Sequence, residues 1–261
     1  TDRPDLWNIK NLFEVKNGQR ILVEECLFEN SWQDGQKGEA IVLTPRNGGT
    51  GNAPWQRVWD ITIRNNDIRN VGNGFLIMGD NSLENPTEQT QRILFTNNFI
   101  EVTETAAEFA RFFKINTQKP DGRPVKDLTI THNTMLHRDG ELGSAAILFE
   151  YNGIQADRLV IENNIMSHGQ YGVQNIQSRA TNYRFASNGF VFNPIHPSYQ
   201  FWLNNFDAKY PGNVKSDTLT DVGFVDAANG NYRLAESSPF KHAGTDGLDL
   251  GADMDAIATM T

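Results

Sequence analysis

A short pattern recurs six times along the 261 residues, and it limits the fold more than any other feature. Its general form is apolar–x–apolar–x–x–Asn–x–apolar. The six copies are ILVEECLF from Ile21, ITIRNNDI from Ile61, ILFTNNFI from Ile93, LTITHNTM from Leu128, LVIENNIM from Leu159 and YRFASNGF from Tyr183. The Asn position recurs after 40, 32, 35, 31 and 24 residues, and Cys26 occupies it in the first copy. A recurring unit of about this length is typical of solenoids and other repeat arrays.

A second apolar run follows most copies after a turn that contains glycine. The runs are AIVLT from Ala40, FLIMG from Phe75, FFKIN from Phe112, AILFE from Ala146 and YGVQNI from Tyr171. Short alternating runs bounded by turn residues indicate β-strands. A helical period is expected only over Glu101–Arg111. The sequence therefore predicts an all-β chain with two or three short strands in each repeat.

One repeat cannot bury its own apolar side chains, but coils stacked ~4.8 Å apart share a continuous core. The predicted inward column is Val23, Ile63, Phe95, Ile130, Ile161 and Phe185. The predicted ladder of hydrogen-bonding side chains is Asn66, Asn98, Asn133, Asn164 and Asn188, with Cys26 at its end. Such a ladder satisfies backbone groups that a tight bend leaves unpaired. We expect a parallel β-helix of about six coils, followed by an irregular C-terminal tail.

From Leu12 to Ile195 the repeat resembles the right-handed parallel β-helix superfamily, often called pectate-lyase-like. The tail DVGFVDAANGNYRLAESSPFKHAGTDGLDLGADMDA is similar to the ends of bacterial proteins with this fold. The run from Lys10 to Arg46, with Ala53–Trp55, resembles uncharacterised β-helix proteins of soil bacteria, which are longer toward the N-terminus. The resemblance implies that residues 1–215 are the C-terminal part of a longer right-handed solenoid. It also implies that residues 216–261 cap the last coils and that the protein is extracellular or on the cell surface.

Composition excludes several classes of protein. The chain has 23 basic and 32 acidic residues, a net charge of −9, which argues against nucleic-acid and anionic-lipid binding. No apolar run approaches the ~18 residues of a membrane span. One cysteine excludes an internal disulfide framework, and the first residues contain no signal peptide. The open edge strands of the first coil predict an N-terminal partner segment or self-association there.

Three residues are predicted to be catalytic, because the resemblance implies a site on the outer face of one sheet. Aligning the second strands places Thr44, Asp80, Asn116 and Glu150 in one column. Asp80 and Glu150 would lie two coils apart, ~9.5 Å, at the upper limit for the acid and base of inverting glycoside hydrolysis. Lys114, on the intervening coil, would remove a proton in a lyase reaction. Alternatively these are ordinary polar strand ends, because one register slip dissolves the column.

The predicted substrate-binding residues lie in loops and at strand ends. Aromatic rings match the apolar faces of sugars, and a long glycine-rich loop, Thr44–Trp55, is a candidate groove wall. The predicted set is Arg46, Trp55, Asn116 and Tyr151. The five histidines lack the spacing of a zinc site, so no metal ligands are predicted. Calcium stays open as a cofactor through Asp80 and Glu150, although the sequence has no Asp-x-Asp-x-Asp-Gly loop.

Two functions from different classes fit these features. The first is a polysaccharide hydrolase or lyase acting in a groove on the outer face of one sheet. The motifs of polygalacturonases and pectin methylesterases are absent, so no particular activity is implied. The second is a non-catalytic glycan-binding or surface-structural segment of a larger secreted protein. In both, the expected partner is a polysaccharide or oligosaccharide.

Overall fold

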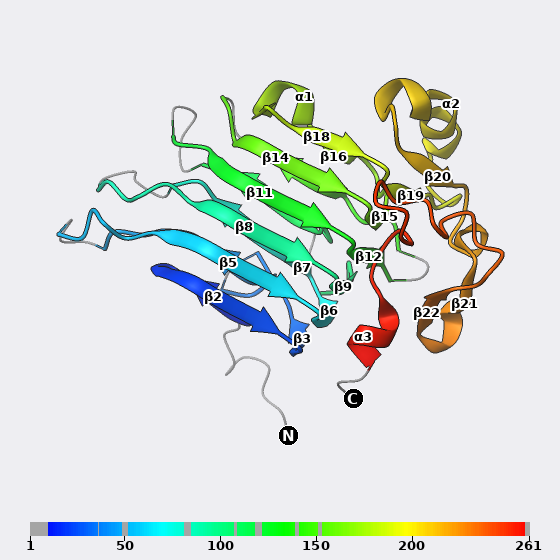
Figure 1. Ribbon diagram of the computed structural model, residues 1–261, viewed down its shortest axis with the longest axis horizontal. Coiled ribbons are helices and arrows are strands. Elements are labelled where there is room, and N and C mark those ends of the chain that lie inside the picture. The colour runs from blue at the N-terminus through cyan, green and yellow to red at the C-terminus, as the bar shows by residue number, and fades with distance from the viewer. Residues whose placement is uncertain are drawn as a thin grey trace.

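The computed structural model describes residues 10–35, 37–48, 52–80, 85–106, 109–117, 122–138, 141–150 and 153–258. Three parallel sheets run along the stack of coils, and the chain visits them in turn (Figure 1). Each of the first five coils thus contributes one strand to each sheet. The predicted all-β parallel β-helix of about six coils is confirmed.

The three sheets are numbered by the order in which the chain enters them. The first sheet contains β1 (Phe13–Val15), β4 (Glu39–Leu43), β7 (Asn73–Met78), β10 (Phe113–Asn116), β13 (Ala145–Phe149) and β16 (Gly172–Gln174). The second contains β2 (Gly18–Glu24), β5 (Val58–Arg64), β8 (Gln91–Thr96), β11 (Val125–Thr131), β14 (Ala156–Glu162), β17 (Ala180–Thr181) and β18 (Arg184–Ala186). The third contains β3 (Leu27–Ser31), β6 (Asp67–Val71), β9 (Phe99–Val102), β12 (Thr134–His137), β15 (Ile165–Ser167), β19 (Gly189–Val191) and β20 (Val214–Ser216).

The remaining elements lie in the C-terminal part of the chain. They are α1 (Ile176–Arg179), α2 (Tyr199–Lys209), α3 (Met254–Ala258) and an antiparallel pair, β21 (Phe224–Asp226) and β22 (Asn231–Leu234). Two short 3-10 turns span Thr220–Val222 and Ala227–Asn229. The helical period expected over Glu101–Arg111 is wrong for the residues that the structure describes there, because β9 continues to Val102 and a turn follows.

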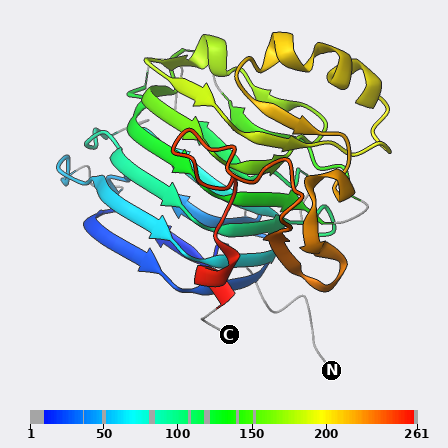
Figure 2. The same ribbon diagram turned by 45° about the vertical axis from the view of Figure 1, so that its right-hand side comes forward.

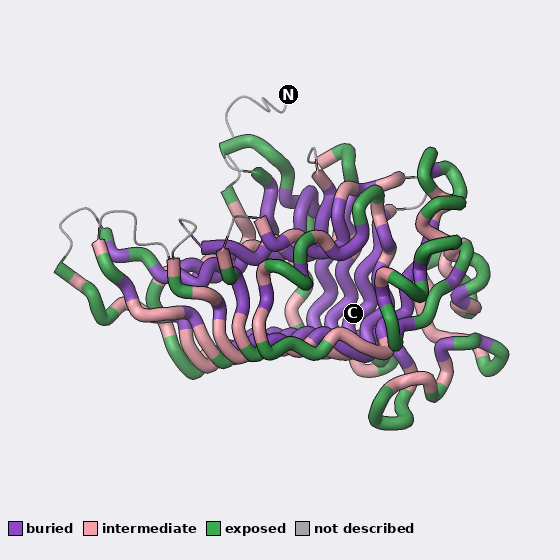
Figure 3. Tube along the Cα trace, turned by 90° about the horizontal axis from the view of Figure 1, so that it is seen from above, coloured by how far each residue is buried: buried purple, intermediate pink, exposed green. Residues whose placement is uncertain are grey.

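The predicted inward column is confirmed by the strand register. Val23 pairs with Ile63, Ile63 with Phe95, and the pairing continues through Ile130 and Ile161 to Phe185. Inward rings from different sheets also meet, since Phe75 of the first sheet and Phe95 of the second lie edge to face with ring centroids 4.7 Å apart. Viewed from above, the buried residues line the interior of the coils (Figure 3). The apolar pattern therefore dictates both the stacking and its register.

The asparagine ladder sits at the bend between the second and third sheets. The Asn133 side chain shows its bonds: Oδ1 accepts from the Asn98 backbone N–H at 3.0 Å, and Nδ2 donates to the Phe95 carbonyl at 3.1 Å. Each ladder residue thus reaches back to the preceding coil. Cys26 makes no such bond, because its thiol donates to Glu24 O within its own coil. The ladder continues one coil further than predicted, to Asn213, which accepts from the Asn188 N–H at 2.9 Å.

A second ladder, on the exposed face of the second sheet, was not predicted. Its members share a left-handed backbone and precede the first apolar residue of each repeat: Arg20, Asp60, Arg92, Asp127 and Arg158. Charges alternate from coil to coil. Arg158 holds Asp127 through two bonds of 2.6 and 2.7 Å, and this contact lowers the pKa of the Asp127 carboxyl.

The C-terminal part of the chain covers the coils in two places. Helix α2 lies over the last coil, where Phe206 and Tyr210 are buried in the core (Figure 2). The tail, residues 216–258 of the described chain, runs along the outer face of the third sheet. There Phe240, Leu250 and Met254 pack in one cluster with residues of β9, β12, β15 and β19. The end of the solenoid is thus closed by α2, and the tail forms a side wall.

Removing one ladder side chain should destabilise the whole stack. Asn133→Ala leaves several buried backbone groups unpaired, each at a cost of about 1–3 kcal/mol. We expect the free energy of unfolding, measured by urea denaturation, to fall by about 3 kcal/mol or more. Asn204→Ala, on the exposed face of α2, is the control and should change it by less than about 0.5 kcal/mol. Equal effects at the two sites would contradict the ladder's role.

Candidate functional site

The predicted column of polar residues on the first sheet is partly wrong. Phe75 pairs with Phe113, and Phe113 with Ile147, so the position of Asn116 is matched on β7 by Met78. Asp80 lies two residues further along, beyond the end of the strand. A slip of two residues keeps every side chain on the same face, because side chains alternate with a period of two. Alternation in the sequence could not reveal it.

Asp80 instead binds the backbone at Arg123, just before β11. Its buried carboxylate accepts the backbone N–H of Arg123 at 2.9 Å, and the Arg123 Nε lies 3.7 Å away. The neighbouring residue must be glycine, because a Cβ at Gly79 would come within 2.1 Å of the Arg123 carbonyl oxygen. The predicted pairing of Asp80 with Glu150 through the strand register is therefore not formed.

Three of the predicted residues do come together on the outer face of the first sheet. Lys114 Nζ lies 2.7 Å from Glu150 Oε2, and Asn116 Nδ2 donates to the same oxygen at 3.0 Å. The Lys114 side chain is only 15% exposed. We name these three residues the Lys114 cluster. It is a compact polar site with one carboxylate, whereas the predicted acid–base pair needed two.

The other predicted binding residues do not join this cluster. Trp55 is 59% exposed, and Arg46 is also exposed. No hydrogen bond or ion pair links either side chain to the Lys114 cluster within the part of the chain that the structure describes. Tyr151 lies outside the described residues. The predicted set is thus split between the cluster and a separate surface loop.

Two concavities lie elsewhere, between the third sheet and the C-terminal part of the chain. Hollow 1 has a volume of about 250 Å³ and is lined by residues 137–138, 141–142, 167–169, 191–196, 199, 202 and 218–220. Hollow 2, of about 320 Å³, is lined by residues 136–137, 219–220, 224, 226–228 and 232. They share His137, Leu219 and Thr220. We call the two together the groove.

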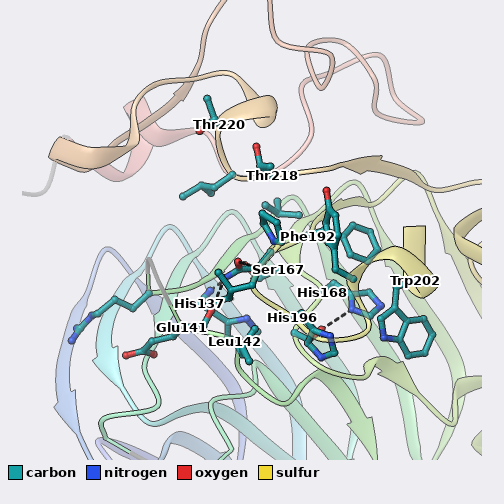
Figure 4. Close-up of a pocket in the computed structure, with 18 residues that line it drawn as sticks. His137, Glu141, Leu142, Ser167, His168, Phe192, His196, Trp202, Thr218 and Thr220 are labelled. Atoms are coloured by element: carbon teal, nitrogen blue, oxygen red, sulfur yellow. Dashed lines mark hydrogen bonds between the residues drawn. The ribbon is translucent and has the colours of Figure 1, made fainter. Parts of the chain in front are cut away.

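Aromatic rings form one end of hollow 1, where His168, His196 and Trp202 lie together (Figure 4). The His168 ring stacks on Phe192 with centroids 4.5 Å apart, and the Trp202 ring lies 5.0 Å from it. Burial lowers the pKa of His168 to about 3 and that of His137 to about 4. Both imidazoles are therefore neutral at pH 7, and each is held by a backbone carbonyl, of Gly169 and Ala110 respectively.

Two buried N–H groups at this end lack a partner. His196 is 9% exposed, and its Nδ1 accepts the Ser198 backbone N–H at 2.8 Å, which leaves the proton on Nε2. His196 Nε2 and Trp202 Nε1 are both buried, and neither forms a hydrogen bond with any residue that the structure describes. A buried donor without a partner costs about 1–3 kcal/mol. Two such donors beside one hollow indicate a site for a ligand that supplies oxygen acceptors.

The acidic group of hollow 1 is already occupied. Glu141 Oε1 accepts from Thr103 Oγ1 at 2.6 Å, and Oε2 accepts the Glu104 backbone N–H at 2.5 Å. Glu141 is the one carboxylate among the residues that line this hollow. The residues described contain no group of three or more His, Cys, Asp or Glu placed to hold a metal ion.

Comparisons with known proteins give no name for the site. No family model, no curated protein and no solved structure matches this chain. In the described part of the chain, no helix has the length and apolar character needed to cross a membrane. The function must therefore be argued from the geometry of the groove and of the Lys114 cluster.

The buried histidines predict an acid-sensitive fold. Their pKa is lower in the folded than in the unfolded state, so the unfolded chain binds more protons below pH ~6.5 and stability falls on acidification. Between pH 7 and 5 each imidazole should remove about 2 kcal/mol from the free energy of unfolding. His137→Gln keeps a donor for Ala110 O. In urea titrations this variant should lose about 2 kcal/mol less of its free energy of unfolding between pH 7 and 5 than the wild type does. His242→Gln, with a largely exposed side chain, should keep the full loss, and a matching reduction there would refute the assignment.

Proposed function

We propose that this protein is a saccharide-binding member of the pectate-lyase-like β-helices and that the groove is its binding site. One observation carries the proposal: two buried N–H donors without partners lie beside an aromatic wall in hollow 1. Sugars present oxygen acceptors at their edges and apolar C–H faces to aromatic rings. Few other small ligands combine both features in one ring.

The size of the groove fits a short oligosaccharide. Small-molecule sites usually enclose ~300–1,000 Å³, and each hollow lies near the lower end, at about 250 and 320 Å³. The hollows meet at Leu219 and Thr220, so neighbouring rings of one chain could occupy both. The net charge of −9 favours a neutral saccharide over a polyanion. The extracellular or cell-surface location implied by the resemblance is part of this proposal.

Binding without cleavage is the version that the groove supports. Glycoside hydrolysis normally needs two carboxyl groups on either side of the scissile bond, ~5–9.5 Å apart. Each hollow offers one carboxylate. Glu141 of hollow 1 has both oxygens already bonded to the loop at 103–104, and Asp226 of hollow 2 accepts a hydrogen bond from Asn229 Nδ2 at 2.8 Å. We therefore propose a glycan-binding role and expect no turnover in the groove.

Blocking the groove should abolish binding. Thr220 lines both hollows and is exposed, so Thr220→Trp places an indole in the opening. We expect the affinity for oligosaccharides selected on a glycan array to fall more than tenfold by calorimetry. Val225→Trp adds similar bulk at an exposed position outside both hollows and should leave the affinity unchanged. Binding that survives Thr220→Trp would place the site elsewhere.

A second candidate function is polysaccharide cleavage at the Lys114 cluster. It is favoured by a specific observation: Asn116 Oδ1 is buried and accepts no hydrogen bond from the residues that the structure describes, beside the Lys114–Glu150 ion pair. A substrate hydroxyl could donate to this oxygen while Glu150 acts as the acid or base.

The cleavage candidate predicts that Glu150→Gln abolishes release of reducing ends or unsaturated products from uronic and neutral polysaccharides. Glu162→Gln, on the second sheet, is the matched control and should have no effect. Wild-type turnover by the Glu150 variant would remove the cluster from consideration.

A further inference from the structure

We propose that the aromatic end of hollow 1, formed by His168, His196 and Trp202, recognises the acetamido group of an N-acetylated amino sugar. This inference rests on the proposed saccharide-binding function and names the class of sugar. It comes from the hydrogen-bonding character of the two groups without partners, both of which are donors.

The identity of both donors is fixed. His196 cannot exchange its roles, because Nδ1 is occupied by the Ser198 N–H at 2.8 Å. Burial also lowers the pKa of His196, which keeps the ring neutral with one hydrogen, on Nε2. The indole nitrogen of Trp202 has a hydrogen and can only donate. The site therefore presents two N–H donors, and a ligand that binds them must supply lone pairs as acceptors.

A carbonyl oxygen suits these donors better than a hydroxyl. It has two lone pairs and no hydrogen, so it can satisfy donors without bringing a hydrogen that needs its own acceptor. A hydroxyl would bring one, and one of the two lone pairs of the Gly169 carbonyl, which lines the same hollow, already takes the His168 Nδ1 hydrogen at 2.7 Å. The ligand group at this end should thus be an acceptor with no hydrogen on its oxygen.

Charge decides whether an amide carbonyl or a carboxylate suits this end of hollow 1 better. The imidazoles at this end are neutral, and the Glu141 carboxylate lines the same hollow, so a second anion would be repelled. The cation of the hollow, Arg138, already binds Glu101 Oε1 at 3.2 Å. A neutral amide is therefore favoured over a uronate.

The apolar wall accounts for the methyl of the acetamido group. Phe192 and Leu219 both line hollow 1, and Phe192 is nearly fully buried against His168. A methyl group attached to the carbonyl gains by leaving water for such a surface. Among common sugars, a carbonyl and a methyl are joined in one neutral substituent in acetylated sugars, of which the N-acetylated amino sugars are one class.

The test compares three trisaccharides of the same linkage, made of N-acetylglucosamine, glucosamine or glucose. Calorimetry on the whole chain should give at least tenfold tighter binding of the acetylated form, which corresponds to about 1.4 kcal/mol. In ¹H–¹⁵N spectra the Trp202 indole resonance should shift downfield with the acetylated sugar alone. The exposed Trp55 indole, outside the groove, is the internal control.

Single variants then test each donor. Trp202→Phe keeps an aromatic ring and removes the N–H. His196→Asn keeps an acceptor for the Ser198 N–H and loses the donor, whereas His196→Gln can restore a donor near the Nε2 position. We expect Trp202→Phe and His196→Asn each to weaken binding of the acetylated sugar about tenfold, His196→Gln to recover part of it, and Trp55→Phe to change nothing.

The possible results distinguish recognition of the acetamido group from saccharide binding in general. Equal binding of the glucose and N-acetylglucosamine trisaccharides, weakened equally by both variants, would overturn the acetamido assignment and leave saccharide binding intact. Tighter binding of the glucosamine form would also overturn it. Failure of the folded protein to bind any saccharide on an array would overturn the proposed function and this inference together.

Discussion

The asparagine ladder is the interaction on which the rest of this structure depends. Each ladder side chain bonds both its own bend and the backbone of the preceding coil, as Asn98 does with Thr96 O and Ile63 O. These bonds bury polar groups that would otherwise be costly, and they have a direction along the stack. A coil that slipped by one residue would lose them all. The ladder therefore fixes the register in which the apolar columns and the three sheets are built.

The turn column beside the ladder serves as the attachment line for the tail. His132 and Asn163 occupy left-handed positions just before a ladder residue. His132 Nε2 lies 2.8 Å from Asp246 Oδ2, and Asn163 Oδ1 accepts the Thr245 N–H at 2.9 Å. The tail is thereby held across several coils of the third sheet. The groove exists because the first part of the tail crosses the sheet at residues 218–220 and leaves a hollow on each side.

The two candidate sites differ in how far their polar groups are satisfied. The Lys114 cluster is an ion pair with an added amide on the outer face of a sheet. The positive charge of Lys114 and the negative charge of Glu150 largely neutralise one another. In hollow 1 the neutral histidines and Glu141 are satisfied within the protein, whereas the donors of His196 and Trp202 are not. A ligand gains the most binding free energy where it supplies acceptors to buried donors that have no partner in the protein. This contrast is why we propose the groove, and not the Lys114 cluster, as the binding site.

The local pattern of the sequence determined the coils, the inward column and the ladder, because each depends on a period of two within strands and on one turn residue per coil. It could also have revealed the charged column from Arg20 to Arg158, since each member directly precedes an apolar run. It misplaced Asp80, because a slip of two residues leaves the alternation unchanged. The groove was decided only by the tertiary structure. Its walls come from Ser167–Gly169, from residues 191–202 and from residues 218–220, which follow no common repeat, and they meet only because the chain folds back along the side of the stack.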